Sequence, residues 1–244
     1  MPERKIYIAQ LKRAIRLSQQ TRHMEFAVQD VDQFSFTPGQ FLSLLADKEG
    51  REITRAYSIA SAPYNNPQFD LCLNRVENGF FSNLLCDMPE GETIRFHGPH
   101  GLFTLRDPLK DSMFICTGTG VAPIRGFVQW LFDGPDRSQG REFWLVYGTR
   151  YEESIYYRDY FEKIAARHPN FHYIITLSRG GKSWRGLQGY VQDHVRAILE
   201  RMPAEKRVDI HAYICGLNHM IKANRTMLME LGLERKSVIY ERYD

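Results

Sequence analysis

The sequence predicts a two-domain protein of the β plus α/β class, in which an antiparallel β-barrel precedes a doubly wound parallel sheet with helices. Before residue 108, short β-rich runs alternate with Gly, Pro and Asn, which is typical of an antiparallel sandwich or barrel. After residue 108, apolar strands alternate with glycine-marked turns and helical stretches, which indicates a parallel sheet. We therefore place the domains at residues 1–107 and 108–244.

The first half is expected to contain six strands and one helix, separated by turn-forming residues. The strands are Ile6–Ala9, Met24–Val28, Phe41–Leu45, Arg55–Ala60, Phe69–Val76 and Thr93–His97. The helix is Phe81–Cys86, opened by Asn78-Gly79. In the second half the expected strands are Ser112–Thr117, Glu142–Tyr147, Phe171–Leu177, Ala212–Cys215 and Ser237–Arg242. The expected helices are a stretch ending near Phe132, then Glu153–His168, Tyr190–Arg201 and Met220–Leu231.

Composition excludes several classes of protein. With 244 residues, of which 43% are apolar, the chain can bury a sizeable core. The net charge of +3 does not favour nucleic-acid binding. The 4 cysteines form no C-x-x-C pair, so we predict no zinc site and no iron–sulfur cluster. No apolar run reaches the roughly 20 residues of a membrane span, and the N-terminus lacks the apolar core of a secretion signal. We expect a cytoplasmic protein without a membrane span.

A glycine-rich turn opens the first helix of the second half. Gly118–Pro123 follows a buried strand and brings backbone N–H groups to a helix N-terminus, where they and the helix dipole favour a phosphate. The alternative is a tight strand–helix turn that binds nothing.

Three further strand ends in the second half carry glycine or small polar residues. These are Gly148–Arg150, Ser178–Arg179 and Cys215–Gly216. Ligands of open α/β sheets bind at the carboxyl ends of the strands. The guanidinium of Arg150 or Arg179 can bind a phosphate monoester through two hydrogen bonds. The 2′-phosphate of NADP is such a group, so these arginines favour NADP over NAD. Each arginine taken alone could equally be a solvated surface charge.

In the first half, Arg55–Ser58 alternates with the period of a strand. Arg55 and Tyr57 therefore share one face, where a cation and a flat aromatic surface suit the pyrophosphate and ring system of a flavin. Ser58 points the other way unless the strand bends. Asn78–Ser82 opens a helix and offers a second anion site.

Taken together, these motifs resemble those of the ferredoxin–NADP(+) reductase family. Arg55–Ser58 resembles its R-x-Y-S flavin motif, and Gly79–Ser82 its G-x-x-S pyrophosphate turn. Gly118–Pro123 resembles its G-T-G-x-x-P loop, and Cys215–Gly216 its C-G motif. His97–Phe103 is similar to the segment that closes the barrel. The order and spacing of the five motifs agree with the family over nearly the whole chain.

The resemblance implies an FAD site in the barrel and an NADP(H) site in the α/β domain. The implied FAD contacts are Arg55, Ala56, Tyr57, Ser58, Leu73, Asn74, Arg75, Val76, Gly79, Phe80, Phe81 and Ser82. The implied nucleotide contacts are Thr119, Gly120, Thr149, Arg150, Ser178, Arg179 and Tyr190. The residues implied to act beside the reacting rings are Ser58, Cys215, Glu241 and Tyr243.

The sequence departs from the family at two places. One branch of the family has a tyrosine at the position of Tyr190 and a lysine at the position of Gln188. Because this chain has Gln188 there, the set of cations for the 2′-phosphate is incomplete. The chain ends in Tyr243–Asp244, whereas the compact bacterial branch ends in an aromatic residue or a short extension over the flavin. Tyr243 could shield the flavin or the nicotinamide subsite, or could be a frayed terminal residue.

The implied activity is hydride transfer from NADPH to flavin N5, followed by single-electron steps to a separate carrier protein, ferredoxin or flavodoxin. We expect a monomer. One alternative is another enzyme of the same fold, either an NAD(P)H-dependent flavin reductase or the reductase component of an oxygenase. A second alternative is a non-catalytic flavin-binding subunit that transfers electrons or senses redox state. A basic patch for an acidic carrier has Lys12, Arg13, Arg16 and Arg22 as candidates.

Overall fold

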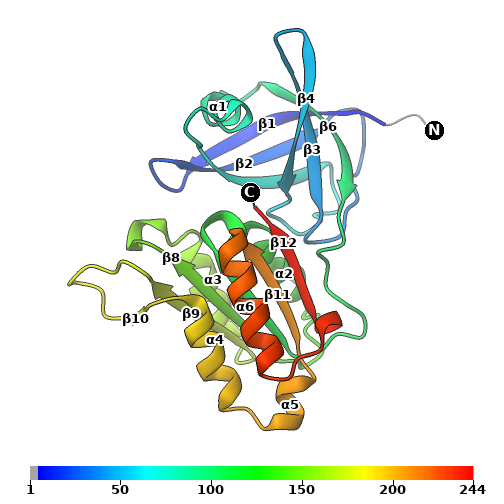
Figure 1. The fold of residues 1–244 in the computed structure, drawn as a ribbon. Helices are drawn as coiled ribbons and strands as arrows, with labels where there is room; N and C mark the ends of the chain where they lie inside the picture. The colour runs from blue at the N-terminus through cyan, green and yellow to red at the C-terminus, as the bar shows by residue number, and fades with distance from the viewer. Residues whose placement is uncertain (1–4, 244) are drawn as a thin grey trace. The chain divides into compact units, whose positions relative to one another are not determined.

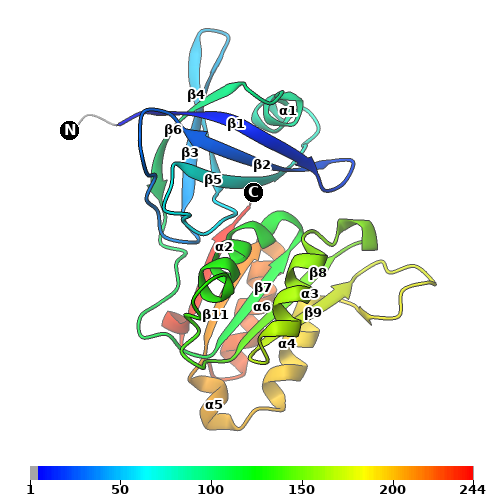
Figure 2. The ribbon, with the colours of Figure 1, turned by 180° about the vertical axis from the view of Figure 1, so that it is seen from behind.

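The computed structural model describes residues 5–243, and these divide into two compact units (Figures 1 and 2). The barrel unit contains the chain up to Thr104 together with Arg125–Trp130. The α/β unit contains Leu105–Ile124 and the chain from Leu131 onward. Among the described residues, no helix has the length and apolar character needed to cross a membrane.

The barrel unit is a 6-stranded antiparallel sheet with the order β4-β3-β6-β1-β2-β5. Its strands are β1 (Tyr7–Arg16), β2 (Thr21–Val28), β3 (Phe41–Lys48), β4 (Arg51–Ser58), β5 (Gln68–Asn74) and β6 (Thr93–His100). A single bridge between Ile59 and Leu71 joins the segment after β4 to β5, which curls the sheet toward closure. Helix α1 (Phe80–Asp87) follows β5. The predicted barrel architecture is confirmed.

Aromatic side chains fill the barrel core. Phe26, Phe34, Phe69 and Phe96 are buried, and Phe69 lies 5.3 to 5.8 Å, centroid to centroid, from each of the other three rings. They come from β2, β5, β6 and the loop between β2 and β3. Burying such large apolar groups is the main driving force for closing a small sheet.

The hairpin of β3 and β4 is longer than predicted. Its distal half, Asp47–Glu52, is largely charged and exposed, so it lacks the apolar alternation by which strands are recognised in a sequence. Pairing continues to Lys48 and Arg51 across a turn at Glu49-Gly50, where both residues adopt positive φ. Backbone hydrogen bonds, not side-chain burial, define this part of the hairpin.

A buried polar network holds Arg125–Trp130 in the barrel unit. Arg125 donates hydrogen bonds to the Ala60 carbonyl (2.6 Å) and to Asp70 Oδ2 (2.9 Å). Tyr64 donates to the same carboxylate oxygen at 2.9 Å. The Asp70 carboxylate is 4% exposed, and a buried charge of this kind requires such partners. His23 Nε2 lies 3.6 Å from it, and burial lowers the pKa of His23 to about 4.

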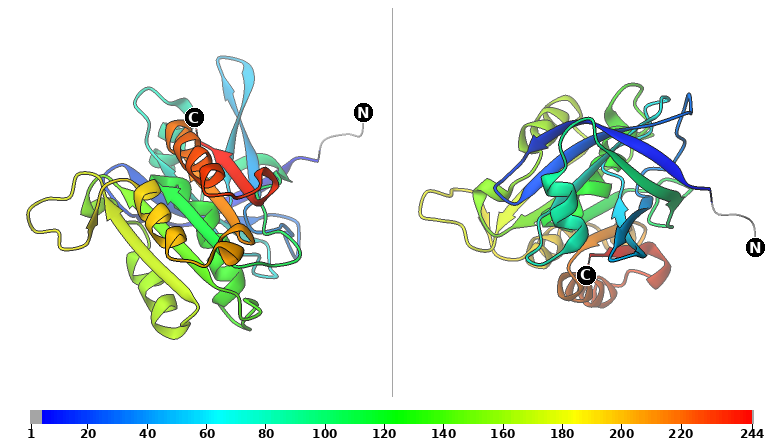
Figure 3. Two further views of the ribbon diagram at one scale, coloured as in Figure 1. Left: turned by 60° about the horizontal axis from the view of Figure 1, so that its bottom comes forward. Right: turned by 90° about the horizontal axis from the view of Figure 1, so that it is seen from above.

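The α/β unit is a 6-stranded parallel sheet with the order β10-β9-β8-β7-β11-β12. Its strands are β7 (Ser112–Thr117), β8 (Phe143–Thr149), β9 (Phe171–Leu177), β10 (Leu187–Gln188), β11 (His211–Gly216) and β12 (Val238–Arg242). Helices α4 (Val191–Glu200) and α6 (Asn218–Glu230) lie side by side over one face (Figures 1 and 3). Helices α2 (Val121–Phe132) and α3 (Arg158–Arg167) cover the other face (Figure 2). This is the predicted doubly wound arrangement.

The local predictions for this unit were inaccurate at three places. The helix expected from Glu153 begins only at Arg158, because Tyr157 has a left-handed backbone (φ 59) that a helix interior does not tolerate. A short 3₁₀ turn, Glu152–Ser154, takes its place. The sequence pattern also missed β10, whose two exposed residues extend the sheet beside β9, and the short helix α5 (Ala204–Val208).

Candidate functional site

The residues of the first motif lie on β4, which forms one edge of the barrel sheet. Arg55 and Ala56 are exposed, Tyr57 is half-buried and Ser58 is 6% exposed. Arg55 pairs with Leu44 and Tyr57 with Leu42, so both side chains share a face of the sheet, as the alternation predicts. Burial raises the pKa of Tyr57 to about 12. The phenol is therefore neutral at physiological pH and presents an uncharged ring.

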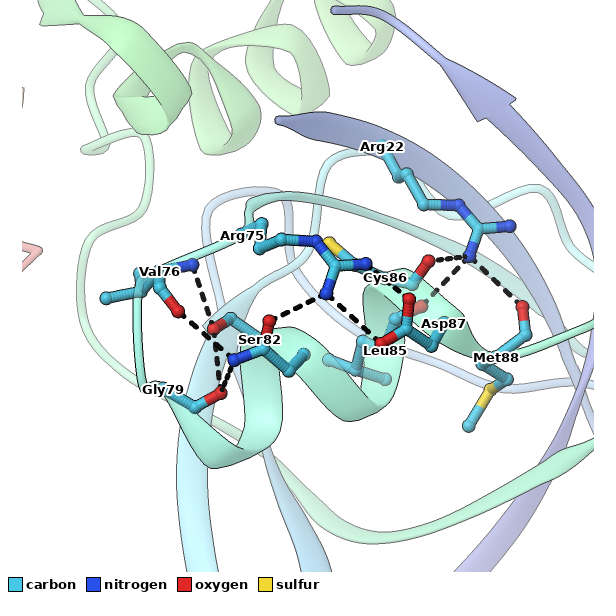
Figure 4. Close-up of polar contacts among 10 residues, drawn as sticks. Arg22, Arg75, Val76, Gly79, Ser82, Leu85, Cys86, Asp87 and Met88 are labelled. Atoms are coloured by element: carbon cyan, nitrogen blue, oxygen red, sulfur yellow. Dashed lines mark hydrogen bonds and ion pairs between the residues drawn. The ribbon is translucent and has the colours of Figure 1, made fainter. Parts of the chain in front are cut away.

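The second motif forms the N-terminus of α1, as Figure 4 shows. Gly79 is the N-cap, and Phe80, Phe81 and Ser82 supply the first helical N–H groups, which have no intrahelical acceptor. Ser82 Oγ accepts a hydrogen bond from the Val76 N–H (3.0 Å) and donates one to the Gly79 carbonyl (3.2 Å). A Cβ on Gly79 would lie 2.5 Å from Ser82 Oγ. A side chain at position 79 would therefore displace the Ser82 hydroxyl from these two hydrogen bonds, which shape the turn.

The segment before α1 has mixed exposure. Leu73 is buried in the core, whereas Asn74 is exposed and its Oδ1 accepts a hydrogen bond from Thr21 Oγ1 at 2.5 Å. Arg75 donates to Asn83 Oδ1 at 2.7 Å and pairs with Asp87. The Val76 side chain is 56% exposed. Arg75 is thus held along α1 by two residues of that helix (Figure 4).

Arg22, one of the predicted docking cations, has a structural role. Its Nη1 donates to the carbonyls of Leu85 (3.1 Å), Cys86 (2.7 Å) and Met88 (3.1 Å) at the end of α1 (Figure 4). A helix leaves its last carbonyls without donor partners, and a cation there also complements the helix dipole. Its guanidinium is directed at α1, so we remove Arg22 from the set of docking candidates.

In the α/β unit, the turn that follows β7 is in close contact with the end of the neighbouring strand β11. Gly118–Gly120 forms a 3₁₀ turn before α2. A Cβ on Gly120 would lie 2.3 Å from the Cys215 carbonyl oxygen, and one on Gly216 would lie 2.6 Å from Thr117 Oγ1. Gly120 meets backbone atoms at that distance, and Gly216 has a positive φ of 150°, so both positions require glycine. Thr119, between the two glycines of the turn, is half-buried.

Three of the four residues implied to act beside the reacting rings come together at this edge. Cys215 is fully buried, and Glu241 is its register partner on β12. The Tyr243 N–H donates to the Gly216 carbonyl at 3.1 Å, so Tyr243 is attached to the end of β11. Burial and the nearby Glu241 charge raise the pKa of the Cys215 thiol, and a hydrogen bond with the Tyr243 side chain opposes that shift. Cys215 is therefore a neutral thiol. Asp244 lies outside the described residues.

The predicted phosphate-binding residues lie at the ends of β8 and β9. The Arg179 N–H donates to the Arg150 carbonyl (3.0 Å), and the Ser178 N–H donates to the Thr149 carbonyl (2.9 Å). Arg150, Ser178 and Arg179 are exposed, whereas Thr149 is 9% exposed. Two guanidinium-bearing residues are thereby fixed side by side at one sheet edge.

Two aromatic residues near this edge were missed by the sequence analysis. Tyr151, 43% exposed, accepts a hydrogen bond from Arg179 Nη1 at 3.4 Å. Trp184 donates to the Leu187 carbonyl at 2.8 Å, and the Arg158 guanidinium lies 5.8 Å from its ring centroid. Tyr151 directly follows the Thr149-Arg150 pair, and this adjacency was the one signal available. Tyr190, which was predicted, is the N-cap of α4 and is 63% exposed.

Family models match both halves of the chain. The oxidoreductase FAD-binding domain matches residues 8–105, and the oxidoreductase NAD-binding domain matches residues 114–226. The chain is 43% identical over 232 residues to ferredoxin–NADP reductase B of Sorangium cellulosum, covering 93% of each chain. The chain belongs to the ferredoxin–NADP reductase family. The recognition made from the motifs, and the expected FAD- and NAD-binding domains, are confirmed.

Reductase components of oxygenases are also relatives. The chain is 32% identical over 213 residues to the phenol 2-monooxygenase reductase component DmpP of a Pseudomonas strain, covering 85% of this chain but 58% of that protein. Among solved structures, a ferredoxin NADP+ reductase from Neisseria gonorrhoeae with bound FAD and NADP has a TM-score of 0.83 at 20% identity. It covers 98% of this chain and 99% of that one, which supports the two-domain fold.

Proposed function

We propose that this protein is an FAD-dependent oxidoreductase that takes electrons from NADPH and passes them singly to a small carrier protein, ferredoxin or flavodoxin. The observation that carries the proposal is the near-full-length 43% identity to a ferredoxin–NADP reductase. We assign residues 1–107 to FAD binding and residues 108–244 to NADP binding. A monomeric, cytoplasmic protein remains our expectation.

The residues of the barrel unit fit an FAD. Arg55 is an exposed cation for the pyrophosphate, and Tyr57 is an uncharged ring on the same face against which an isoalloxazine can stack. The first N–H groups of α1, at Phe80–Ser82, provide a second set of donors for the phosphates. Bound FAD supplies the redox chemistry, because it takes two electrons at once and releases them one at a time. The chain's own residues bind and orient the reactants.

The end of the sheet at β8 and β9 is suited to a 2′-phosphate. The backbone hydrogen bond between Arg150 and Arg179 keeps two cations adjacent, and a doubly charged phosphate monoester is bound best by such a pair. The Tyr151 ring lies beside Arg179, and Tyr190 is exposed at the start of α4. Either ring offers a flat surface for adenine. These features support NADPH as the electron donor.

Cys215, Glu241 and Tyr243 are proposed to surround the nicotinamide. Because Cys215 is a neutral, fully buried thiol, it acts as a packing surface and not as a nucleophile. Gly120 allows the turn after β7 to approach the end of β11 closely, which supports a fixed position of the thiol relative to the turn proposed to receive the dinucleotide. The backbone hydrogen bond from Tyr243 to Gly216 supports a role in which the tyrosine covers this surface and moves aside for the nicotinamide. Ser58, in the barrel unit, is proposed to bind near flavin N5.

A second candidate function is favoured by the similarity to DmpP, namely the reductase component of an oxygenase. The chain spans 58% of that relative, and its 4 cysteines lie too far apart in sequence to form a C-x-x-C cluster motif. Such a protein would still need a separate one-electron carrier, or would reduce free flavin.

The decisive experiment begins with the visible spectrum of the purified protein, followed by anaerobic titration with NADPH and with NADH. A yellow protein that NADPH bleaches at much lower concentration than NADH supports the cofactor and donor assignments. Steady-state rates with ferredoxin, flavodoxin and free FMN then test the acceptor. Efficient reduction of FMN, with neither carrier protein reduced, would overturn the carrier assignment.

A further inference from the structure

The turn that connects β10 to α4, residues 188–190, is attached to the end of β9, the strand beside β10 in the sheet (Figure 1). The Gly189 N–H donates to the Leu177 carbonyl at 3.0 Å. The Gly189 carbonyl accepts a hydrogen bond from Thr176 Oγ1 at 3.1 Å, and Thr176 is fully buried. Gly189 has φ 109, a conformation that favours glycine. Both backbone polar groups of Gly189 are thus held by β9, which sets the path of the turn.

His194, on the first turn of α4, adds a hydrogen bond from a second element. Its Nε2 lies 3.0 Å from the Gln188 carbonyl oxygen and 3.0 Å from Thr176 Oγ1. A hydroxyl has a single hydrogen to donate, and Thr176 donates it to Gly189. A carbonyl can only accept, so Nε2 must carry a hydrogen and donate it toward these two oxygens. The charged ring and one neutral tautomer both carry that hydrogen.

The turn carries Tyr190, which follows Gly189 directly. Tyr190 is 63% exposed, so the position of its ring is set mainly by the backbone that bears it. Tyr190 is the N-cap of α4, and its carbonyl accepts the Asp193 N–H at 3.1 Å. A hydrogen bond with Tyr151 raises the pKa of Arg179, and Tyr190 acts on it in the same direction. Tyr190 therefore lies in the neighbourhood of Arg179, where the 2′-phosphate is proposed to bind.

We propose that His194 is a positioning residue for the adenosine half of the nicotinamide dinucleotide. By donating to the Gln188 carbonyl, it fixes the backbone from which the Tyr190 ring is presented to adenine. This inference rests on the proposed function, which gives adenine an aromatic ring at this edge. A surface that is ordered before binding loses less freedom when the ligand arrives, so it binds more tightly. NADPH and NADH share adenosine, so His194 should act on both, whereas Arg179 acts on the 2′-phosphate alone.

The test compares three variants of His194 with a matched control. His194→Leu removes the donor. His194→Gln can place an amide N–H where Nε2 lies, whereas the shorter side chain of His194→Asn stays polar but does not reach the Gln188 carbonyl. His172→Leu is the control, because His172 is half-buried like His194 but stands at the other end of β9 from Thr176.

The ligands are ADP-ribose and 2′-phospho-ADP-ribose, which are NAD and NADP without the nicotinamide ring and so undergo no hydride transfer. Their Kd values are measured by calorimetry on each FAD-loaded protein. Menadione reduction then gives KM and kcat with NADPH and with NADH. The Kd of 2′-phospho-ADP-ribose is also measured for His194→Asn in a Tyr190→Ala background.

We expect His194→Leu and His194→Asn to raise the Kd of both ligands by about fivefold, the size of one lost hydrogen bond, while His194→Gln and the control stay within about twofold of the wild type. The kinetic change should appear in KM for both NADPH and NADH, and not in kcat. In the Tyr190→Ala background, His194→Asn should change Kd by less than about twofold, because residues that act through one another are not additive.

Wild-type Kd values in both the Leu and the Asn variants would overturn the positioning proposal. A change confined to 2′-phospho-ADP-ribose would also overturn it, by making His194 a phosphate contact. An equal effect of His194→Asn with and without the Tyr190 ring would overturn the route through Tyr190. A wild-type protein that reduces no carrier protein would overturn the proposed function alone, because the affinities are measured without a carrier. A wild-type protein that binds neither ligand would overturn both.

Discussion

Replacing Gly120 with alanine tests whether the contact between the turn after β7 and the end of β11 controls catalysis. The new Cβ would lie 2.3 Å from the Cys215 carbonyl oxygen, 2.7 Å from its carbon and 3.0 Å from the Gly216 nitrogen. All three atoms are backbone, so no side-chain rotation relieves the clash. One loop must retreat by about 1 Å, and a misplacement of that size near the reacting groups can cost about 100-fold in rate. We expect kcat/KM for NADPH to fall by about that factor.

The assay is NADPH oxidation with menadione, normalised to bound FAD from the visible spectrum. FAD content should be unchanged, because the barrel motifs are not altered. Gly181→Ala is the matched control: its Cβ would come no closer than 3.9 Å to any neighbour, and its φ is not positive. The loop argument is refuted if the Gly120→Ala protein oxidises NADPH within about twofold of the control at full FAD content.

Three further predictions concern charges. Arg179→Gln should raise KM for NADPH by about tenfold or more, since a hydrogen bond to a charged group is worth roughly 1.5–3 kcal/mol. The same variant should change KM for NADH less than twofold. Equal changes in the two KM values would remove Arg179 from the 2′-phosphate site. Arg55→Ala should purify with little FAD, whereas Arg51→Ala on the same strand should stay yellow, and a fully yellow Arg55→Ala protein would contradict the flavin assignment. His23 has a pKa of about 4 in the fold against 6.5 when unfolded, so its contribution to stability is complete above pH 6.5 and is lost as the pH falls toward 4. The free energy of unfolding, measured in urea, should fall between pH 7.5 and pH 5, and this fall should be about 2 kcal/mol smaller in His23→Gln than in the wild type. An equal fall in both proteins would show that His23 is not the group that titrates.

The sequence identified the site motifs because each is local. A strand, a glycine-rich turn and a helix N-terminus are specified within a few residues, and their order along the chain carried the family resemblance. The predicted edge residues Arg150 and Arg179 also came together, because the carboxyl ends of parallel strands lie at one edge of the sheet. Cys215 and Glu241 became neighbours for the same reason.

Some roles depend on contacts between distant segments and could not be predicted. Arg22 binds carbonyls more than 60 positions away, and Arg125 binds a carboxylate 55 positions away. Periodicity and local spacing carry no information about such pairs, because the partners meet only after the sheet has formed. The cluster of arginines around Tyr240 could not be predicted either, because α6, the turn before β12 and β12 each contribute one of them.

The sequence by itself determined the two-domain class, the flavin and nucleotide motifs and the family, because these depend on residue type, period and order. Only the tertiary structure decided which of these residues make structural contacts and which are exposed to solvent. It directed Arg22 to the end of α1 and left Arg55 exposed on an edge strand. It also required glycine at position 120, because a backbone carbonyl from β11 lies where a side chain would begin. A pattern records what each residue can do, whereas packing determines which of those interactions its neighbours permit.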